Sequence, residues 1–209
     1  MEKCLIEPHY LGSLEYFIKI TSHSEIILET HEHFKKQTFK NRCEFLSSHG
    51  KSVLSIPVIY DNRTPIKDVR IDHSQGWQRE HLGTFCSAYG KSPFFEFFKD
   101  QFELIWKKQH DFLLDLNLEM MTLCLTLLQS NLSISISSEY QQVPDSTILD
   151  QRELILPKRN YTGRSIYMPY EYAQVFGNNF VPNLSIVDLL MNEGPNAMMI
   201  LRKSAKDFN

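Results

Sequence analysis

The fold depends most on the segment from residue 3 to residue 29, which reads KCLIEPHYLGSLEYFIKITSHSEIILE. Its first apolar run ends at Ile6, and Pro8 soon follows, where a missing N–H costs a strand least. Apolar residues then recur at helical spacing from Leu11 to Ile20, and a second short apolar run covers 25–29. A strand, a helix and a strand in so short a segment form a βαβ unit, which predicts two parallel neighbouring strands.

The next segment, residues 42–58, has the pattern of a β-hairpin. Two apolar runs flank the polar turn 48–51, in which Gly50 can take the positive φ that such turns often need. Over residues 66–71, the spacing of Ile66, Asp68 and Arg70 at every second position predicts a further strand, with one face in water. Pro57 and Pro65 lie near the ends of these strands.

The rest of the chain is mainly helical in pattern. Helices are expected over 77–89, 93–107, 112–128, 182–191 and 196–203, and strict alternation over 132–137 predicts a strand. Residues 141–161 have no clear period and are expected to form a long loop with an apolar anchor at 154–156. We therefore predict an α/β fold, a single domain over residues 1–209 with an N-terminal βαβ unit, a hairpin extension and a largely helical C-terminal half.

Composition narrows the class of protein. The 209 residues carry a net charge of −3, and no run of Lys and Arg is long enough to neutralise a row of phosphates, so nucleic acid is not an expected partner. The apolar stretch 112–128 is interrupted by Asp115, Asn117 and Glu119, which favours a buried helix over a membrane span. The first residues lack the apolar region of a secretory signal. These features predict a cytoplasmic protein.

Cysteine and histidine spacing does not indicate a metal site. Cys4, Cys43, Cys86 and Cys124 are far apart and are expected to be buried thiols in a reducing compartment. His31 and His33 would share one side of a strand, as two metal ligands should, but no third ligand is signalled nearby. A solvated polar loop is the favoured interpretation of residues 29–33, and the sequence indicates no particular cofactor.

Specific residues then support a family resemblance. The run FVPNLSIVDLLMNEG at 180–194 closely resembles the ending of the WbqC-like family. Shorter stretches that fit the same family are Glu7-Pro8-His9-Tyr10 with Gly12, Tyr16 and Phe17; Phe39-Lys40-Asn41-Arg42; and Trp77 with His81, Tyr89 and Pro93. The chain departs from the usual pattern at Glu7, where the family has Gln, and at Phe39, where it has Trp. Members of the family are associated with bacterial O-antigen and other surface-polysaccharide gene clusters, which implies a role in that metabolism.

Two candidate site groups lie in the N-terminal half. His9 follows the first strand at a position where α/β sheets bind ligands, so it is a candidate phosphate contact, although a surface loop residue is the alternative. Arg42, with its planar fork of donors, and the neighbouring Asn41 could anchor a carboxylate or phosphate. The alternative for Arg42 is a surface arginine paired with a nearby acid.

A second group lies on the expected helices. Trp77 and His81 are four residues apart and share a helix face, which Tyr89 extends, so they could form a sugar platform with an acid or base. The alternative is that both are core residues. Asp188 lies in an apolar helix and must be paired or solvent-facing, with Arg42 or His81 as possible partners. Cys86 is turned away from His81 by its spacing, which argues against a Cys–His nucleophile.

These candidates define the functional hypotheses. The leading one is an enzyme of surface-polysaccharide or sugar-nucleotide metabolism, a transferase that modifies an amino sugar, with His81 and Asp188 in catalysis. Substrate binding would then fall to Asn41, Arg42, Trp77, Tyr89 and His9. The alternatives are a Rossmann-like nucleotidyl- or adenylyl-transferase that uses the Pro8–Gly12 loop, and a non-catalytic accessory protein of surface-glycan assembly. The expected ligand is a small molecule or a sugar nucleotide.

Overall fold

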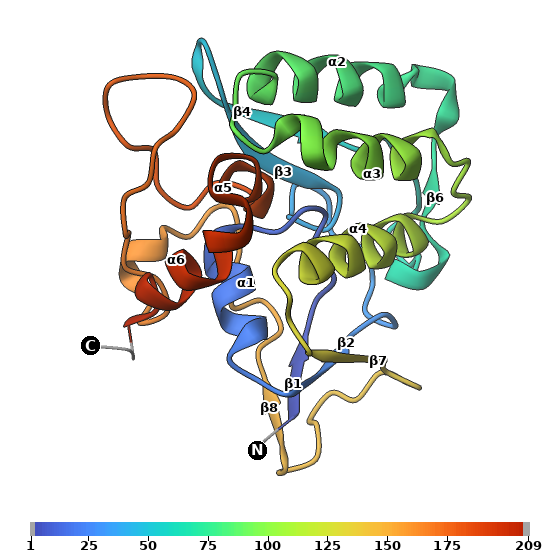
Figure 1. Cartoon of the computed structure of the whole chain (residues 1–209). Coiled ribbons are helices and arrows are strands. Elements are labelled where there is room, and N and C mark those ends of the chain that lie inside the picture. Colours follow the sequence, from blue (N-terminus) through green and yellow to red (C-terminus); the bar gives the residue numbers. More distant parts are fainter. Residues whose placement is uncertain (1–2, 207–209) are drawn as a thin grey trace.

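The computed structural model describes residues 3–206 and has a parallel four-stranded sheet at its base. The strand order is β7-β2-β1-β8, and every neighbouring pair runs parallel. The strands are β1 (Lys3–Ile6), β2 (Glu25–Leu28), β7 (Ser133–Ile136) and β8 (Ile148–Asp150). Figure 1 shows the sheet at the bottom of the molecule, with the helices above and to the left. The predicted βαβ unit is confirmed, because β1 and β2 pair in parallel around α1 (Leu14–Thr21).

The two faces of the sheet differ. Cys4, Ile6, Ile26 and Leu28 point to one face and are almost fully buried. On the opposite face Leu5 is buried, whereas Ile27 and Ser135 are only half-buried. Because side chains alternate along a strand, the sheet has one face in the core and one face that is partly open.

Helix α1 is capped at its N-terminus by Ser13. The Ser13 hydroxyl accepts a hydrogen bond from the Tyr16 N–H at 3.3 Å, as a capping residue does. Ser13 also forms an isolated bridge with Ser185, whose hydroxyl donates to the Leu11 carbonyl at 2.8 Å. The start of α1 is thereby joined to the start of α5 (Ile186–Glu193), far away in the sequence.

The predicted hairpin is confirmed as β3 (Arg42–Ser47) and β4 (Gly50–Ser55), in antiparallel register. Gly50 has the expected positive φ, +95°. The prediction of one strand over 66–71 is wrong in its first half. Ile66–Asp68 is a 3-10 turn (η1) that follows Pro65, and only β6 (Arg70–Ile71) pairs with β5 (Val58–Ile59). Proline fixes the backbone before the turn, and the three-residue period of a 3-10 turn places both Ile66 and Val69 in the core.

The helical part follows the predicted pattern. Its longer members are α2 (Trp77–Tyr89), α3 (Phe95–Lys107) and α4 (Leu113–Leu127), and α6 (Ala197–Lys203) follows α5. Helix α5 is central, since it contacts α1, α3, α4, α6 and strand β3. Seven of its eight residues are buried, including Asp188. The motif at 180–194 therefore contributes the central helix of the core.

Two other expectations are corrected. The segment 141–161, expected to be a loop, contains β8, which forms the edge of the sheet beside β1. The anchor within it is present, because Ile155 is buried. Cys86 was expected to be buried, but it is exposed on α2, whereas Cys4, Cys43 and Cys124 are buried. The helix turns the residue after buried Phe85 outward.

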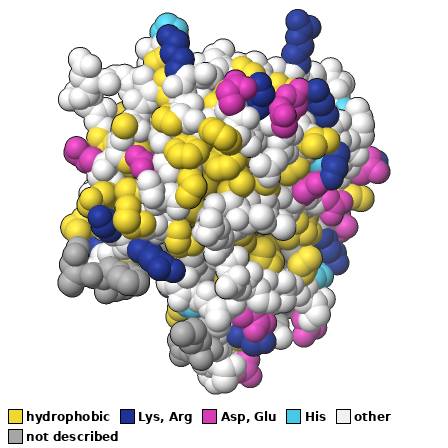
Figure 2. All heavy atoms as spheres, in the orientation of Figure 1, with side chains coloured by type: hydrophobic (Ala, Val, Ile, Leu, Met, Phe, Trp, Pro, Cys, Tyr) yellow, Lys and Arg dark blue, Asp and Glu magenta, His cyan; other side chains and the backbone are white. Residues whose placement is uncertain are grey.

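Within residues 3–206 we find no helix with the length and apolar character needed to cross a bilayer. Hydrophobic side chains nevertheless gather on the outside, over the face formed by α3, α5 and α6 (Figure 2). Phe97 is 73% exposed and Leu104 is 65% exposed, both on α3. Met199 on α6 is 46% exposed.

The cap of α1 gives a direct test of the fold. We expect Ser13→Ala to lower the free energy of unfolding by about 1 kcal/mol, because the Tyr16 N–H loses its acceptor. The matched control is Ser22→Ala, at the exposed end of the same helix, which should change it by less than about 0.5 kcal/mol. Urea denaturation of both variants measures the difference. Equal effects would contradict the capping role.

Candidate functional site

Trp77 and His81 share a face of α2, as the sequence predicts, but that face points into the core. Trp77 is 1% exposed and His81 is 0% exposed. Their rings meet edge-on with centroids 5.1 Å apart, and the His81 ring also lies against Tyr10 and Trp106. His81 Nδ1 is 2.8 Å from the Trp77 carbonyl oxygen. A buried indole has no free face for a sugar, so this placement matches the alternative of two core residues.

Asn41 and Arg42 lie at the base of the hairpin. The Asn41 amide donates to the Ile56 carbonyl at 2.8 Å, which holds the end of β4 against the start of β3. Arg42 is half-buried, and its Nε–H is buried without a hydrogen-bond partner in residues 3–206. Neither Arg42, Trp77 nor His81 lines any of the principal pockets, so the structure does not bring these three side chains to one cleft.

Asp188 and Tyr89 belong to a separate buried group. The Asp188 carboxylate accepts hydrogen bonds from the Tyr172 hydroxyl at 2.7 Å and from the Gln174 amide at 3.0 Å. Burial raises the pKa of Asp188 to about 6, and these hydrogen bonds oppose part of that rise. Burial, reinforced by the nearby Asp188 charge, raises the pKa of Tyr89 well above its usual value. Asp188 therefore ties the irregular segment after Tyr167 to the central helix α5.

His9 is not the surface residue that one interpretation of the sequence suggested. It is 3% exposed and stacks on Tyr16 with ring centroids 4.2 Å apart, while Phe39 packs on it at 5.5 Å. Burial is the larger cause, and the positive charge of Lys40 the smaller one, of a lowered His9 pKa of about 3. His9 is a neutral ring at neutral pH, enclosed by two aromatic side chains.

A group of charged side chains lies at the carboxyl edge of the parallel sheet. The chain leaves β1 towards β2 on one side, while β8 pairs with β1 on the other side. Such a reversal of strand order is where α/β proteins bind ligands, outside the carboxyl ends of the strands. Six polar side chains collect there, which we call the carboxyl-edge cluster: Glu7, Glu29, His31, Glu32, Lys40 and Arg152.

Lys40 holds the first half of this cluster together. Its side chain is 1% exposed, and its ammonium is paired with Glu7 and lies 3.4 Å from Glu32. Glu7 also accepts the N–H of Glu153 at 3.3 Å, which joins the loop after β1 to the segment after β8. Glu153 in turn pairs with Lys35, which is 3.1 Å from Glu32. A buried ammonium is stable only when carboxylates compensate its charge.

Glu29 organises the second half. One carboxylate oxygen accepts the His31 N–H at 2.8 Å and the Ser137 hydroxyl at 3.2 Å, and the other lies 3.4 Å from Arg152. His31 Nδ1 is 3.1 Å from the Ser137 oxygen. Glu29 is 1% exposed, whereas His31 is half-buried. The His31 imidazole, half-buried like Ser137, therefore contacts the hydroxyl of a residue that lines the pocket beside Glu29.

A pocket of about 200 Å³ opens beside Glu29 on the partly open face of the sheet. Its floor is formed by apolar strand residues such as Leu5 and Ile27, and its polar lining consists of hydroxyl, amide and carboxylate groups. The polar residues that line it are Glu29, Ser135, Ser137, Ser138, Glu139 and Gln141. Arg152 holds the loop over this pocket, because it donates to the Gln141 carbonyl at 2.9 Å and lies 5.3 Å from the Tyr140 ring.

Within residues 3–206, no group of three or more His, Cys, Asp and Glu side chains is arranged to hold a metal ion.

The sequence analysis interprets residues 29–33 of this cluster as a solvated polar loop. It did not consider Lys40, Glu7 or Arg152 as site residues. The available signal was position, since Glu7, Glu29 and Ser137 each directly follow a strand.

The buried histidines predict a loss of stability in acid. A histidine with a lowered folded-state pKa contributes stability above its unfolded pKa of about 6.5 and loses it as pH falls towards the folded value. The folded-state pKa is about 3 for His9 and about 4 for His81. Each histidine therefore lowers the free energy of unfolding by about 2 kcal/mol between pH 7 and pH 5.

Asp188 acts in the opposite sense, because its raised pKa makes protonation near pH 6 stabilise the folded state. We expect a net loss of about 2–3 kcal/mol from pH 7 to pH 5, measured by urea denaturation. His81→Phe should reduce this loss, whereas His49→Asn, at an exposed turn, should leave it unchanged. A free energy of unfolding that is constant from pH 7 to pH 5 would contradict this account.

Comparison with known proteins agrees with the C-terminal motif. The family described as the WbqC-like protein family matches residues 7–168 and 160–200. No curated protein and no solved structure matches this chain. The family match includes both halves of the carboxyl-edge cluster as well as helix α5, and it is compatible with a role in surface-polysaccharide biosynthesis. The chain therefore belongs to the WbqC-like protein family.

Proposed function

We propose that this chain is an enzyme of surface-polysaccharide or sugar-nucleotide metabolism, a transferase that modifies an amino sugar at the carboxyl-edge cluster. The observation that carries the proposal is the convergence of buried charged side chains at the point where the strand order reverses. Burying several charges is costly, and sites of catalysis are where such arrangements concentrate.

The charge of the cluster favours a cationic or amine-bearing ligand. The ion pairs of the cluster join five carboxylates to three cations: Glu7, Glu29, Glu32, Asp150 and Glu153 face Lys35, Lys40 and Arg152. The pocket beside Glu29 contains a second carboxylate, Glu139, and no Lys or Arg among its lining residues. An amino group would balance this charge, and the serine hydroxyls and Gln141 suit the hydroxyls of a sugar ring.

Within this site we assign the proton transfer to His31. Its half-buried imidazole can remove a proton from the amino or hydroxyl group of the ligand as that group attacks the acyl carbon of an acyl donor. The new N–acyl or O–acyl bond replaces the bond between the acyl carbon and the donor's leaving group, and the imidazolium returns its proton to that leaving group. Glu29 and Ser137 are positioning residues, because they bond the backbone and ring of His31 and leave the imidazole in a fixed place. Asp188, Trp77 and His81 then act through the stability of the core.

The two alternative functions have less support. A nucleotidyl-transfer role for His9 needs a ring that can reach a triphosphate, whereas His9 is enclosed by Tyr16 and Phe39. The nucleotidyl-transfer role would instead be favoured if ATP and magnesium stabilised the protein against unfolding and this effect were lost in His9→Ala. An accessory role would be favoured by the absence of turnover together with co-purification of a pathway enzyme.

Turnover tests the assignment of His31. The protein is incubated with a nucleotide-linked amino sugar and a panel of acyl donors, and mass spectrometry follows the added mass on the sugar. We expect His31→Ala to lower turnover at least about 100-fold, the range for loss of a general acid or base. The matched control is the exposed neighbour, His33→Ala, which should retain turnover. Equal activity of the two variants would refute the role of His31.

Ligand binding tests the charge argument separately. A nucleotide sugar with a free amino group should bind more tightly than the same molecule with a hydroxyl in its place, because only the protonated amine adds a positive charge beside Glu29 and Glu139. Glu29→Gln should weaken amine binding about tenfold or more, as expected for loss of a charged partner. Glu103→Gln, on the exposed surface of α3, is the control. Preference for the hydroxyl form would contradict an amino-sugar site.

A further inference from the structure

A second pocket, of about 460 Å³, lies away from the Glu29 pocket and is rich in basic residues. It is formed by the hairpin, the segment 156–164 that follows β8, and residues 181–183 before α5. Phe39 is part of its wall and directly precedes Lys40 of the carboxyl-edge cluster. The basic residues that line it are Lys51, Lys158, Arg159 and Arg164, and Glu44 is its acidic residue.

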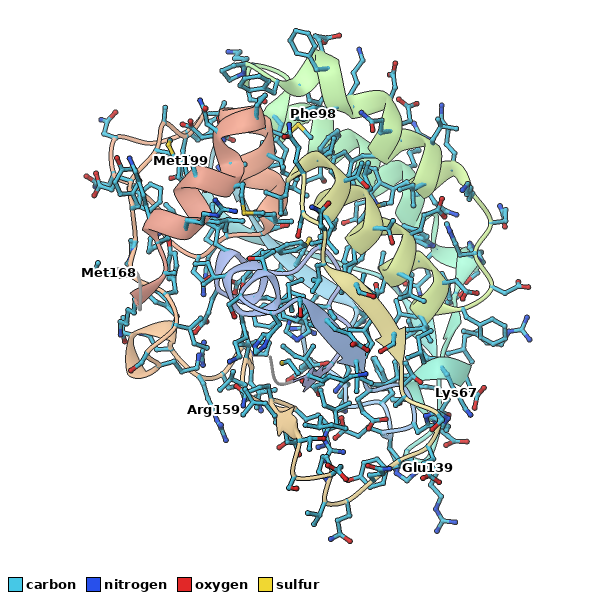
Figure 3. The ribbon with its side chains drawn as sticks, turned by 60° about the horizontal axis from the view of Figure 1, so that its bottom comes forward. Lys67, Phe98, Glu139, Arg159, Met168 and Met199 are labelled. Carbon is cyan, nitrogen blue, oxygen red and sulfur yellow. The ribbon has the colours of Figure 1, made fainter. Side chains whose placement is uncertain are left out.

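Two of these cations are not neutralised. Lys51 is paired with Glu44 at 2.9 Å, and Arg164 with Glu15 at 2.6 Å. Lys158 and Arg159 have no ion pair within 4 Å in the part of the chain that the structure describes. Figure 3 shows Arg159 extending outward from the segment after β8. The pocket therefore carries an excess of two positive charges at its rim, which attracts a dianion.

Arg164 supplies a fixed fork at the side of this pocket. Its guanidinium is held by Glu15, which is 0% exposed, through Nε and Nη2, each 2.6 Å from a carboxylate oxygen. Nη1 donates to the Arg159 carbonyl at 3.3 Å. A guanidinium has five N–H groups, so two remain without an acceptor in residues 3–206. Planar N–H pairs of this kind suit phosphate oxygens.

The backbone around the cations is also fixed. The hydrogen bond from Arg164 to the Arg159 carbonyl closes the turn, and the Asn160 side chain accepts the Thr162 N–H at 3.1 Å. On the other side of the pocket, the Asn183 side-chain amide donates to Glu15 at 3.3 Å. The Asn183 backbone has a left-handed conformation, with φ +56°. The amide oxygen of Asn183 also accepts the Glu15 N–H at 2.9 Å. A basic pocket whose walls are already ordered loses little freedom when an anion binds.

We propose that this pocket binds a phosphate-type dianion, in which Lys158 and Arg159 contact the charge and Arg164 orients its oxygens. The chemistry is shared by free phosphate, pyrophosphate and the phosphates of a nucleotide. This proposal goes beyond the transferase activity and does not rest on it, because the residues involved are not those of the carboxyl-edge cluster.

Isothermal titration calorimetry with pyrophosphate tests the pocket, with inorganic phosphate and UDP as further probes. Pyrophosphate should bind with a Kd below about 1 mM, and binding should weaken as salt rises from about 50 to 200 mM. The double variant Lys158→Ala/Arg159→Ala should weaken binding at least tenfold. Arg164→Lys keeps the charge beside Glu15 but loses the fork, so it should bind more weakly, and its unfolding temperature, measured in parallel, confirms that the variant is folded at the titration temperature.

The matched control is Lys99→Ala/Lys107→Ala, which removes the same charge from α3 and should leave the Kd within about twofold. The double variant Lys158→Ala/Arg159→Ala with an unchanged Kd would overturn the proposal, and so would a native chain that binds none of the three probes. A stronger signal for UDP than for pyrophosphate supports a nucleotide as the source of the phosphate. His31→Ala should bind pyrophosphate normally, so a failure here is distinguishable from a failure of the transferase assignment.

Discussion

The buried ammonium of Lys40 is the constraint on which the arrangement of this molecule depends. Its side chain is almost fully removed from water and is compensated by Glu7, which follows β1, and by Glu32, which follows β2. The Lys40 carbonyl accepts a hydrogen bond from Asn117 in α4 at 2.7 Å, and the neighbouring Phe39 carbonyl accepts the Tyr10 N–H. Lys40 thus connects the strand ends of the sheet to the helical half, and it lies just before the hairpin in the sequence.

The same constraint prepares the site. Because the Glu7 carboxylate is fixed by Lys40 and by the Glu153 N–H, the segment after β8 is held beside the loop after β1. That segment brings Arg152 to Glu29, and Arg152 in turn holds the loop over the open face of the sheet. The second pocket begins where the segment continues, at residue 156. Both proposed ligand sites are therefore built on the connection that Lys40 makes between the two edges of β1.

Local patterns were enough to predict much of the fold but little of the site. The β1–α1–β2 unit, the hairpin turn at Gly50 and the long helices follow from spacing and capping residues that act over a few positions. Strand β8 was missed because three residues in a polar segment become a strand only through their pairing with β1. The spacing of Trp77 and His81 correctly placed them on one face, but a period cannot tell whether that face meets solvent or Trp106. Lys40 and Glu7 are 33 residues apart, and no sequence pattern links them.

A double-mutant cycle on Lys40 and Glu7 tests the central claim most directly. The free energies of unfolding are measured for the native chain, Lys40→Met, Glu7→Gln and the variant with both changes. Lys40→Met leaves the buried Glu7 carboxylate without its cation, which costs about 3–5 kcal/mol, and Glu7→Gln leaves the Lys40 ammonium with Glu32 alone. The double variant should recover a large part of these losses. The account predicts a coupling energy of at least about 2 kcal/mol; effects that add to within about 0.5 kcal/mol would contradict it.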